Sequence, residues 1–217
     1  MNVSRVVTLA ALYGAGGSVV GPAVAERLGV PFLDRAAAAG VAKRAGLRAE
    51  ALEDADEEPR SRWEDVFAAI GRASPPTAAW DQAEGLDRQD RNLHAEVEQF
   101  LAEVGRSGGV ILGRGGAVVL ASVPGALHVY MGGNRDQRIE RVMNLQGLDR
   151  GTAADRADAY DEARRDYVKS VYGIEGDNPE LYHLMIDAVS LGVDVCIDLI
   201  VAASESRVRT SMSAAAG

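Results

Sequence analysis

The stretch VSRVVTLAALYGAGGSVVGPAVAERLGVPFLD, residues 3–34, decides the fold of this chain. Its first part, residues 3–11, is rich in Val and Leu and is typical of a parallel strand that is buried on both faces. The glycine cluster Gly14-Ala15-Gly16-Gly17 follows, and an amphipathic pattern that starts near residue 18 predicts a helix. A strand, a tight glycine turn and a helix in this order are the layout of a phosphate-binding loop.

The loop matches the standard phosphate-loop pattern G-x-x-x-x-G-K-[ST] only in part. Ala11 replaces the first glycine, and Gly16 is the second. Gly17 occupies the position of the lysine, whereas Ser18 fills the position of the hydroxyl that holds Mg²⁺ in such loops. The alternative interpretation is a tight turn that serves only to pack the helix against the strand.

Composition limits the classes of protein that remain. The 217 residues fit one domain, expected over 1–204 with a flexible tail over 205–217. The net charge of −9 argues against nucleic acid as a partner, because neutralising phosphates needs a basic face. No apolar run approaches the roughly 18 residues of a membrane span, and the chain enters a strand almost directly, so we expect a cytoplasmic protein without membrane contact.

Cysteine and histidine give no sign of a metal centre. Cys196 is the only cysteine, and its neighbours VDVCIDLIVAA predict a core thiol on a buried helix face rather than a nucleophile. The three histidines have no metal-ligand spacing with one another or with this cysteine, so no metal site is expected in the protein itself.

Short apolar segments alternate with helical patterns along the rest of the chain, which predicts an α/β fold: a doubly wound parallel sheet with flanking helices. The expected strands are 31–33, 109–112, 126–131 and 184–189, and the expected helices include 35–45, 93–105, 152–171 and 194–203. Asn134 is expected to cap a further helix with Ile139 and Val142 pointing inward. The acidic, breaker-rich residues 46–92 are expected to form a helical insert.

Arginines supply the second set of candidate site residues. Arg114 follows a buried strand between glycines, so it is expected at the carboxyl edge of the sheet, where its planar fork suits phosphate. A surface arginine at a turn is the alternative. The balanced charges of 135–169 predict a solvated helix, but Arg164 and Arg165 within it are also compatible with a lid that closes on transferred phosphate.

Taken together, these motifs resemble the cytidylate kinase-like family, a branch of the nucleoside monophosphate kinases with the phosphate-loop fold. The matching segments are Gly14 to Gly17 followed by Gly21, Val30-Pro31-Phe32-Leu33-Asp34, Val110 to Gly115, Asp161-x-x-Arg164-x-x-Tyr167, and Leu181-Tyr182-His183-Leu184 through Asp187 to Leu191. They occur in the order of the family and cover most of the chain.

The resemblance implies a function and a set of site residues. ATP with Mg²⁺ would bind at Gly14, Ala15, Gly16, Gly17 and Ser18, and the nucleoside monophosphate would bind near Asp34 and Arg114. Arg114, Arg164 and Arg165 would be catalytic, because phosphoryl transfer between two anions needs positioning and positive charge. The insert at 46–92 would close over the acceptor, and 149–172 would form the lid-like helix.

Three functions remain open from the sequence. The first is ATP-dependent phosphoryl transfer to a small acceptor, a nucleoside monophosphate such as CMP. The second is a degenerate kinase that binds nucleotide or a protein partner without catalysis, because Ala11-Leu12 and Ser18-Val19 stand where the family has charged residues and no cation remains in the loop. The third is a ligand-free interaction module. The alanine-rich helix expected at 35–45 offers an apolar face for a homodimer.

Overall fold

The computed structural model describes residues 4–33, 104–113 and 115–216. Five strands form one sheet in the order β2-β3-β1-β4-β5, and every pairing is parallel. The strands are β1 Val6–Ala11, β2 Phe32–Leu33, β3 Gly109–Leu112, β4 Leu127–Gly132 and β5 Leu184–Asp187. β1 lies in the centre, where Val7 pairs with both Val110 and Leu127, so the loop after β1 leaves the middle of the sheet.

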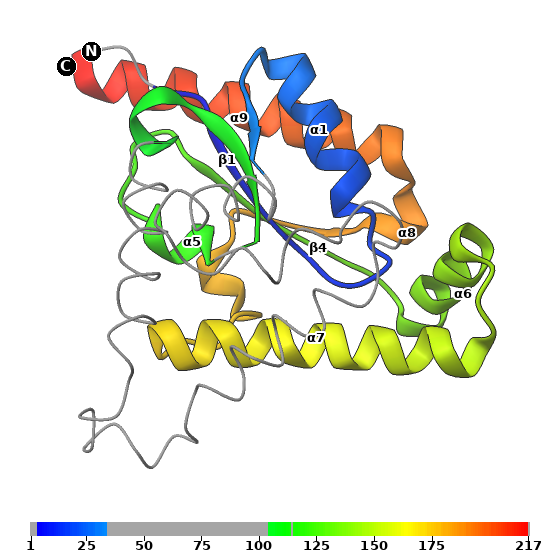
Figure 1. Ribbon diagram of the computed structural model, residues 1–217. Helices are drawn as coiled ribbons and strands as arrows, with labels where there is room; N and C mark the ends of the chain where they lie inside the picture. Colours follow the sequence, from blue (N-terminus) through cyan, green and yellow to red (C-terminus); the bar gives the residue numbers. More distant parts are fainter. Residues whose placement is uncertain (1–3, 34–103, 114, 217) are drawn as a thin grey trace, which may run out of the picture.

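Helices cover both faces of the sheet, which confirms the expected doubly wound α/β fold (Figure 1). The helices are α1 Gly17–Leu28, α5 Gly116–Val119, α6 Arg135–Gln146, α7 Arg150–Tyr172, α8 Ala188–Leu191 and α9 Val193–Ala216, with a 3₁₀ turn at Pro179–Leu181. α1 and α9 lie on one face, whereas α5 and α7 lie on the other. α6 lies beside the turn that connects β1 and α1.

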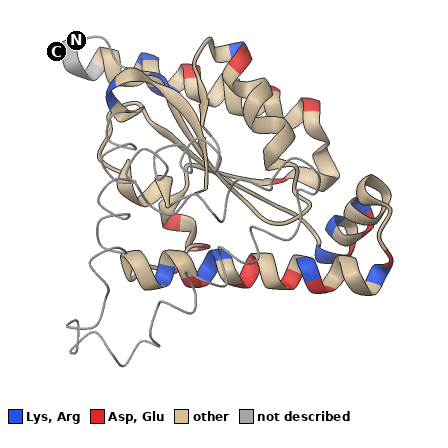
Figure 2. Ribbon diagram, in the orientation of Figure 1, with Lys and Arg blue, Asp and Glu red and all other residues tan. Residues whose placement is uncertain are grey.

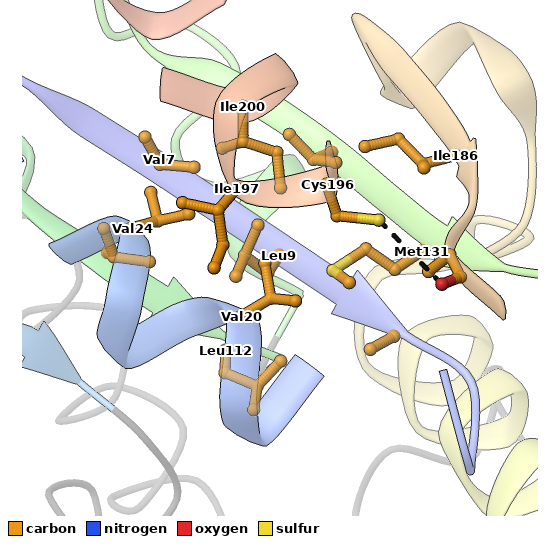
Figure 3. Close-up of a cluster of buried hydrophobic side chains, with 14 of the residues drawn as sticks. Val7, Leu9, Val20, Val24, Leu112, Met131, Ile186, Cys196, Ile197 and Ile200 are labelled. Carbon is orange, nitrogen blue, oxygen red and sulfur yellow. Dashed lines mark hydrogen bonds between the residues drawn. The ribbon is translucent and has the colours of Figure 1, made fainter. Parts of the chain in front are cut away.

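The main core fills the space between the sheet, α1 and α9 (Figure 3). Its strand residues alternate with residues that face α5 and α7, because successive side chains of a strand point to opposite faces. The buried members include Val7, Leu9, Val20, Val24, Met131, Cys196, Ile197 and Ile200. Burying each large aliphatic side chain contributes about 1.5–3 kcal/mol, so this layer holds the sheet against both helices. The prediction of a core thiol at Cys196 is confirmed.

Capping residues set where the charged helices begin. The Asn134 side chain accepts hydrogen bonds from the N–H groups of Asp136 at 2.9 Å and Gln137 at 3.3 Å, so α6 starts where the sequence predicts. Ile139 and Val142 are buried, also as predicted. Asp149 caps α7 in the same way by accepting from the N–H of Thr152.

The C-terminal helix is longer than the sequence pattern predicts. The expected end of this helix at Ala203 is wrong because α9 continues to Ala216, whereas the flexibility expected of residues 205–217 stays a prediction. Ser204 is fully buried, and Arg207 donates from Nε to the carbonyl of Ala126 at 2.6 Å. The apolar periodicity stops, but this contact beside the sheet lies within the extension and helps to hold the helix. The domain boundary at 204 itself stays a prediction.

Several sequence predictions lie outside the described residues. These are the helix at 35–45, the insert at 46–92 and most of the helix at 93–105, of which the structure describes helical residues from 104 onward. Within the described ranges, no helix combines the length and the apolar character that crossing a membrane requires.

Candidate functional site

The turn between β1 and α1 adopts the backbone conformation that its glycines allow. Gly14 and Gly16 have φ of 77° and 86°, in the left-handed region, and Gly16 is the N-cap of α1. The Ala15 N–H donates to the carbonyl of Leu12 at 3.0 Å, which closes the turn. Gly14, Ala15, Gly16, Gly17 and Ser18 thus occupy the predicted place before α1, and their role in binding phosphate stays a prediction.

Backbone donors converge at the start of α1. The carbonyl of Gly16 accepts from Val19 and Val20, whereas the N–H groups of Gly16, Gly17 and Ser18 find no acceptor among the described residues. Such orphan donors at the positive end of a helix dipole favour an anion. The Ser18 side chain is exposed beside them, where its hydroxyl is able to hold a phosphate-bound cation.

One face of α6 packs directly against this turn. A Cβ added at Gly14 would lie 2.7 Å from the carbonyl oxygen of Arg138 and 3.0 Å from Val142. A Cβ at Gly16 would lie 3.0 Å from Nη2 of Arg141. Positions 138, 141 and 142 share a helix face, so the backbone of α6 also requires a glycine at position 14, whereas position 16 meets only the end of the Arg141 side chain.

A buried ion pair holds the backbone of Tyr13 at the start of the turn. Arg138 donates from Nη1 to Oδ2 of Asp161 at 2.9 Å and to the Tyr13 carbonyl at 2.7 Å. Oδ1 of the same Asp161 accepts from the Tyr13 N–H at 2.9 Å. The two side chains are only 6% and 9% exposed, so this ion pair ties α6, α7 and the turn together.

A pocket opens beside the turn, at the carboxyl ends of β1 and β3 and under α5 and α7. Its lining includes Thr8, Ala11, Gly113, Gly115, Arg164 and Tyr182. Ligands of open parallel sheets bind at this edge of the sheet. The predicted site residues Asp34 and Arg114 lie outside the described residues, although both glycines that flank Arg114 line the pocket.

The structure separates the two predicted lid arginines. Arg164 donates from Nη2 to the Gly176 carbonyl at 3.0 Å and to the Tyr182 hydroxyl at 3.3 Å, and its guanidinium carbon lies 5.1 Å from the ring centre of Tyr130. Its Nη1 is buried without a hydrogen-bond partner among the described residues. Arg165 is exposed and does not line the pocket.

Burial tunes the two tyrosines around Arg164. It raises the pKa of Tyr130 and of Tyr182 above their usual value, while the nearby guanidinium opposes the shift. Both phenols therefore stay protonated, and Tyr182 donates to the Gly176 carbonyl at 2.6 Å. Arg164 is thus held in place by neutral partners, so its charge is not neutralised by them.

A stacked histidine pair, in which His128 is buried and His183 is exposed, lies behind the pocket. His128 Nδ1 is 2.9 Å from the Thr8 hydroxyl, and the rings of His128 and His183 stack with centroids 4.9 Å apart. Burial, then the charges of His183 and Arg207, lower the pKa of His128 to about 4. Both rings are therefore neutral at pH 7, because burial also lowers the pKa of His183. In the described parts of the chain, no three potential metal ligands gather.

Sequence reasoning missed Arg138, Arg141 and Asp161 as site residues, because it assigned most of the charges in 135–169 to solvent. Figure 2 shows charges of both signs along α6 and α7, and the sequence does not mark the inward ones. The sequence signal that could have identified the two arginines of α6 was their spacing along the helix. Arg138 and Arg141 follow Asn134 at helical intervals, in step with the buried Ile139 and Val142.

Comparison with known proteins places this geometry in a family. Residues 6–190 match the model of the cytidylate kinase-like family. An uncharacterized protein from Eubacterium ventriosum has a similar structure, with a TM-score of 0.64 and 17% identity over 93% of this chain and 99% of that one. A protein from Thermus thermophilus also has a similar structure, with a TM-score of 0.50 and 17% sequence identity. The likeness covers 92% of this chain and 97% of that one.

A curated relative, the uronate isomerase of Corynebacterium glutamicum, is 36% identical over 141 residues. The match covers 65% of this chain and 26% of the relative, so this chain spans about a quarter of that relative's length. The five-stranded parallel sheet, the helices on both faces and the glycine turn after the central strand are those of a P-loop kinase-like fold. The chain belongs to the cytidylate kinase-like family.

Proposed function

We propose that this protein transfers a phosphoryl group from ATP to a small acceptor, a nucleoside monophosphate such as CMP. The observation that carries this proposal is a set of three successive N–H groups, at Gly16, Gly17 and Ser18, that find no acceptor in the described part of the chain and lie next to a pocket lined by Arg164. Two neighbouring sites for anions are what transfer between two phosphates requires.

The donor would bind at the turn. Gly14, Ala15, Gly16, Gly17 and Ser18 would surround the phosphates of ATP, with backbone N–H groups as donors. The exposed Ser18 hydroxyl fits Mg²⁺, because this ion takes oxygen ligands and reaches such sites on nucleotide phosphates. When bound, Mg²⁺ would neutralise phosphate charge.

The acceptor would bind in the pocket, where the proposal uses Arg164. Its buried Nη1 lacks a partner among the described residues, and a buried donor without a partner is costly unless a ligand oxygen accepts from it. Asp34 and Arg114 complete the acceptor site in this proposal. Arg165 is exposed, so its contact with phosphate requires a movement of α7.

The alternative is a degenerate kinase that binds nucleotide or a protein partner without catalysis. Ala11 and Gly17 favour it, because they remove the first glycine and the lysine of the standard loop. A lost cation weakens stabilisation of the transition state more than binding of the ground state. Binding without turnover would be the result.

Turnover with a panel of acceptors distinguishes the two functions. ADP release from ATP and Mg²⁺ is measured with CMP, with other nucleoside monophosphates and with glucuronate, the last because of the likeness to a uronate isomerase. We expect release that depends on CMP, and about a 100-fold lower rate in Arg164→Ala, as for loss of one positioned donor. Lys169→Ala, at an exposed ion pair on the same helix, is the control.

Each result has a distinct meaning. ATP binding by calorimetry without turnover for any acceptor would favour the degenerate kinase. If the protein shows neither ATP binding nor turnover, both functions are overturned and an interaction module remains. The cytoplasmic location, the homodimer and the absence of nucleic-acid binding stay predictions, and sedimentation of the protein alone and with DNA tests the last two.

A further inference from the structure

The structure explains why the loop carries no lysine of its own. A Cβ at Gly17 would lie 2.6 Å from the Cβ of Ala11 and 3.0 Å from Cδ1 of Leu112. Ala11 has no rotamer that would move its Cβ away, and both neighbours are buried. With alanine at position 11, a lysine at position 17 therefore does not fit without a shift of the backbone.

A cation reaches the loop from another element instead. The guanidinium of Arg141, on α6, covers Gly16: an added Cβ there would lie 3.0 Å from Nη2, 3.4 Å from Cζ and 3.4 Å from Nη1. The guanidinium thus fills the space where a side chain at position 16 would stand. It lies directly at Gly16, whose N–H is the first of the three donors that have no acceptor within the described ranges.

Arg141 differs from the other arginines of α6, and from Arg150 at the start of α7, because it has no counter-ion among the described residues. Arg135, Arg138 and Arg150 form ion pairs with Asp158, Asp161 and Asp136. Among the residues that the structure describes, Arg141 makes neither a hydrogen bond nor an ion pair. A half-buried guanidinium without a partner beside unsatisfied N–H groups is arranged for an anion.

Contacts of its neighbours fix the part of α6 that carries Arg141. One turn earlier on α6, Arg138 holds Tyr13 through the buried ion pair with Asp161. The backbone of α6 also touches Gly14. The helix therefore does not move away from the turn without breaking these contacts, so the backbone that carries Arg141 stands beside the turn before a ligand binds.

We propose that Arg141 is the phosphate-binding cation of this site and takes the place of the missing loop lysine toward the polyphosphate of a nucleoside triphosphate. This inference rests on the proposed function, because it assumes that nucleotide binds at the turn. Its guanidinium fork offers two donors to phosphate oxygens where a lysine would offer a point charge.

Calorimetric titration with ATP and Mg²⁺ tests this assignment. Arg141→Ala should bind ATP about 10- to 100-fold more weakly than the unaltered protein, as expected for loss of a charged hydrogen bond. Arg141→Lys should lose less of the affinity for ATP than Arg141→Ala, because it keeps the positive charge. Arg135→Ala, on the same helix but exposed and paired with Asp158, should change the affinity less than about threefold.

The lost affinity should come only from contacts with the phosphates of ATP. Adenosine, used as a second probe, should bind all these variants equally, which a general distortion of the site would not allow. If the unaltered protein binds ATP and Arg141→Ala binds it equally well, the assignment fails while the proposed function stands. If the unaltered protein does not bind ATP, both fail.

Relocating the charge gives an independent test. Adding Ala11→Gly and Gly17→Lys to Arg141→Ala returns a lysine to the loop and removes the Cβ that stands 2.6 Å away. We expect this triple variant to regain most of the lost ATP affinity. A folded triple variant that binds ATP no better than Arg141→Ala overturns the equivalence of the two positions.

Discussion

At the scale of single residues, the site depends on which charges are buried. Arg138 and Asp161 are 6% and 9% exposed at their side chains, whereas Arg135 and Asp158, one turn away on the same two helices, are 48% and 59% exposed. Removing one partner of a buried pair leaves an uncompensated charge, but an exposed pair is screened by water. The same two helices are thus joined by two ion pairs, of which the buried one should matter much more for the stability of the fold.

Asp161→Asn should therefore be strongly destabilising. We expect the free energy of unfolding to fall by about 3–5 kcal/mol, because Arg138 loses its counter-ion and Tyr13 loses a charged acceptor. Asp158→Asn is the matched control and should cost less than about 1 kcal/mol. Urea denaturation followed by circular dichroism measures both, and equal losses in the two variants would contradict the role of the buried pair.

At the scale of elements, packing decides how long a helix becomes. α6 and α7 begin at capping side chains that are visible in the sequence. α9 ends far beyond its apolar pattern, because Arg207 reaches the Ala126 carbonyl that precedes β4. Short helices without tertiary contacts are marginal in water, so such a contact is able to hold the last turns.

Arg207→Ala should show whether that contact stabilises α9. Loss of a hydrogen bond from a charged donor predicts a decrease of about 1.5–3 kcal/mol in the free energy of unfolding. Arg209→Ala, exposed on the same helix and 3.9 Å from Glu205, should change it by less than about 0.5 kcal/mol. If Arg207→Ala matched this control in thermal and urea unfolding, the end of α9 would not depend on the sheet.

At the scale of the whole molecule, the parallel sheet gathers distant segments at one edge. Tyr13 and Asp161 are 148 residues apart in the chain and 2.9 Å apart in the fold. The histidine pair has a similar origin, since His128 lies on β4 and His183 directly precedes β5. Contacts of this kind form only when the strands have paired, so they report on global rather than local stability.

Global stability should fall on acidification. The pKa of His128 is about 4 in the folded protein against 6.5 for an ordinary histidine, so the unfolded chain binds more protons between these values. Stability is therefore greatest above pH 6.5 and decreases as the pH falls toward about 4, by roughly 3 kcal/mol at about 1.4 kcal/mol for each pKa unit.

Urea denaturation at several pH values measures this dependence. His128→Asn removes the group that titrates, so its free energy of unfolding should vary less between pH 6.5 and 5 than that of the unaltered protein. Because burial also lowers the pKa of His183, some dependence should remain in this variant. An unchanged slope would show that His128 does not resist protonation in the folded state.

Much of the fold was predictable because the responsible signals are local. The strand bounds at 109–112, the cap at Asn134, the buried thiol at Cys196 and the glycine turn before α1 follow from neighbours within a few residues of each other. Periodicity, capping and turn chemistry act over this range. The alternation of strands and helices then restricts the architecture to a parallel sheet covered on both faces.

The composition of the site was predictable only in part. That Arg164 lines the pocket while Arg165 is exposed, that Asp161 holds the turn, and that Arg141 covers Gly16 all depend on how α6 and α7 pack against a loop more than 100 residues earlier. Charged helices look alike in sequence because either face is able to meet water. Tertiary packing alone selects which face is buried, and that selection placed a cation beside a loop that has none of its own.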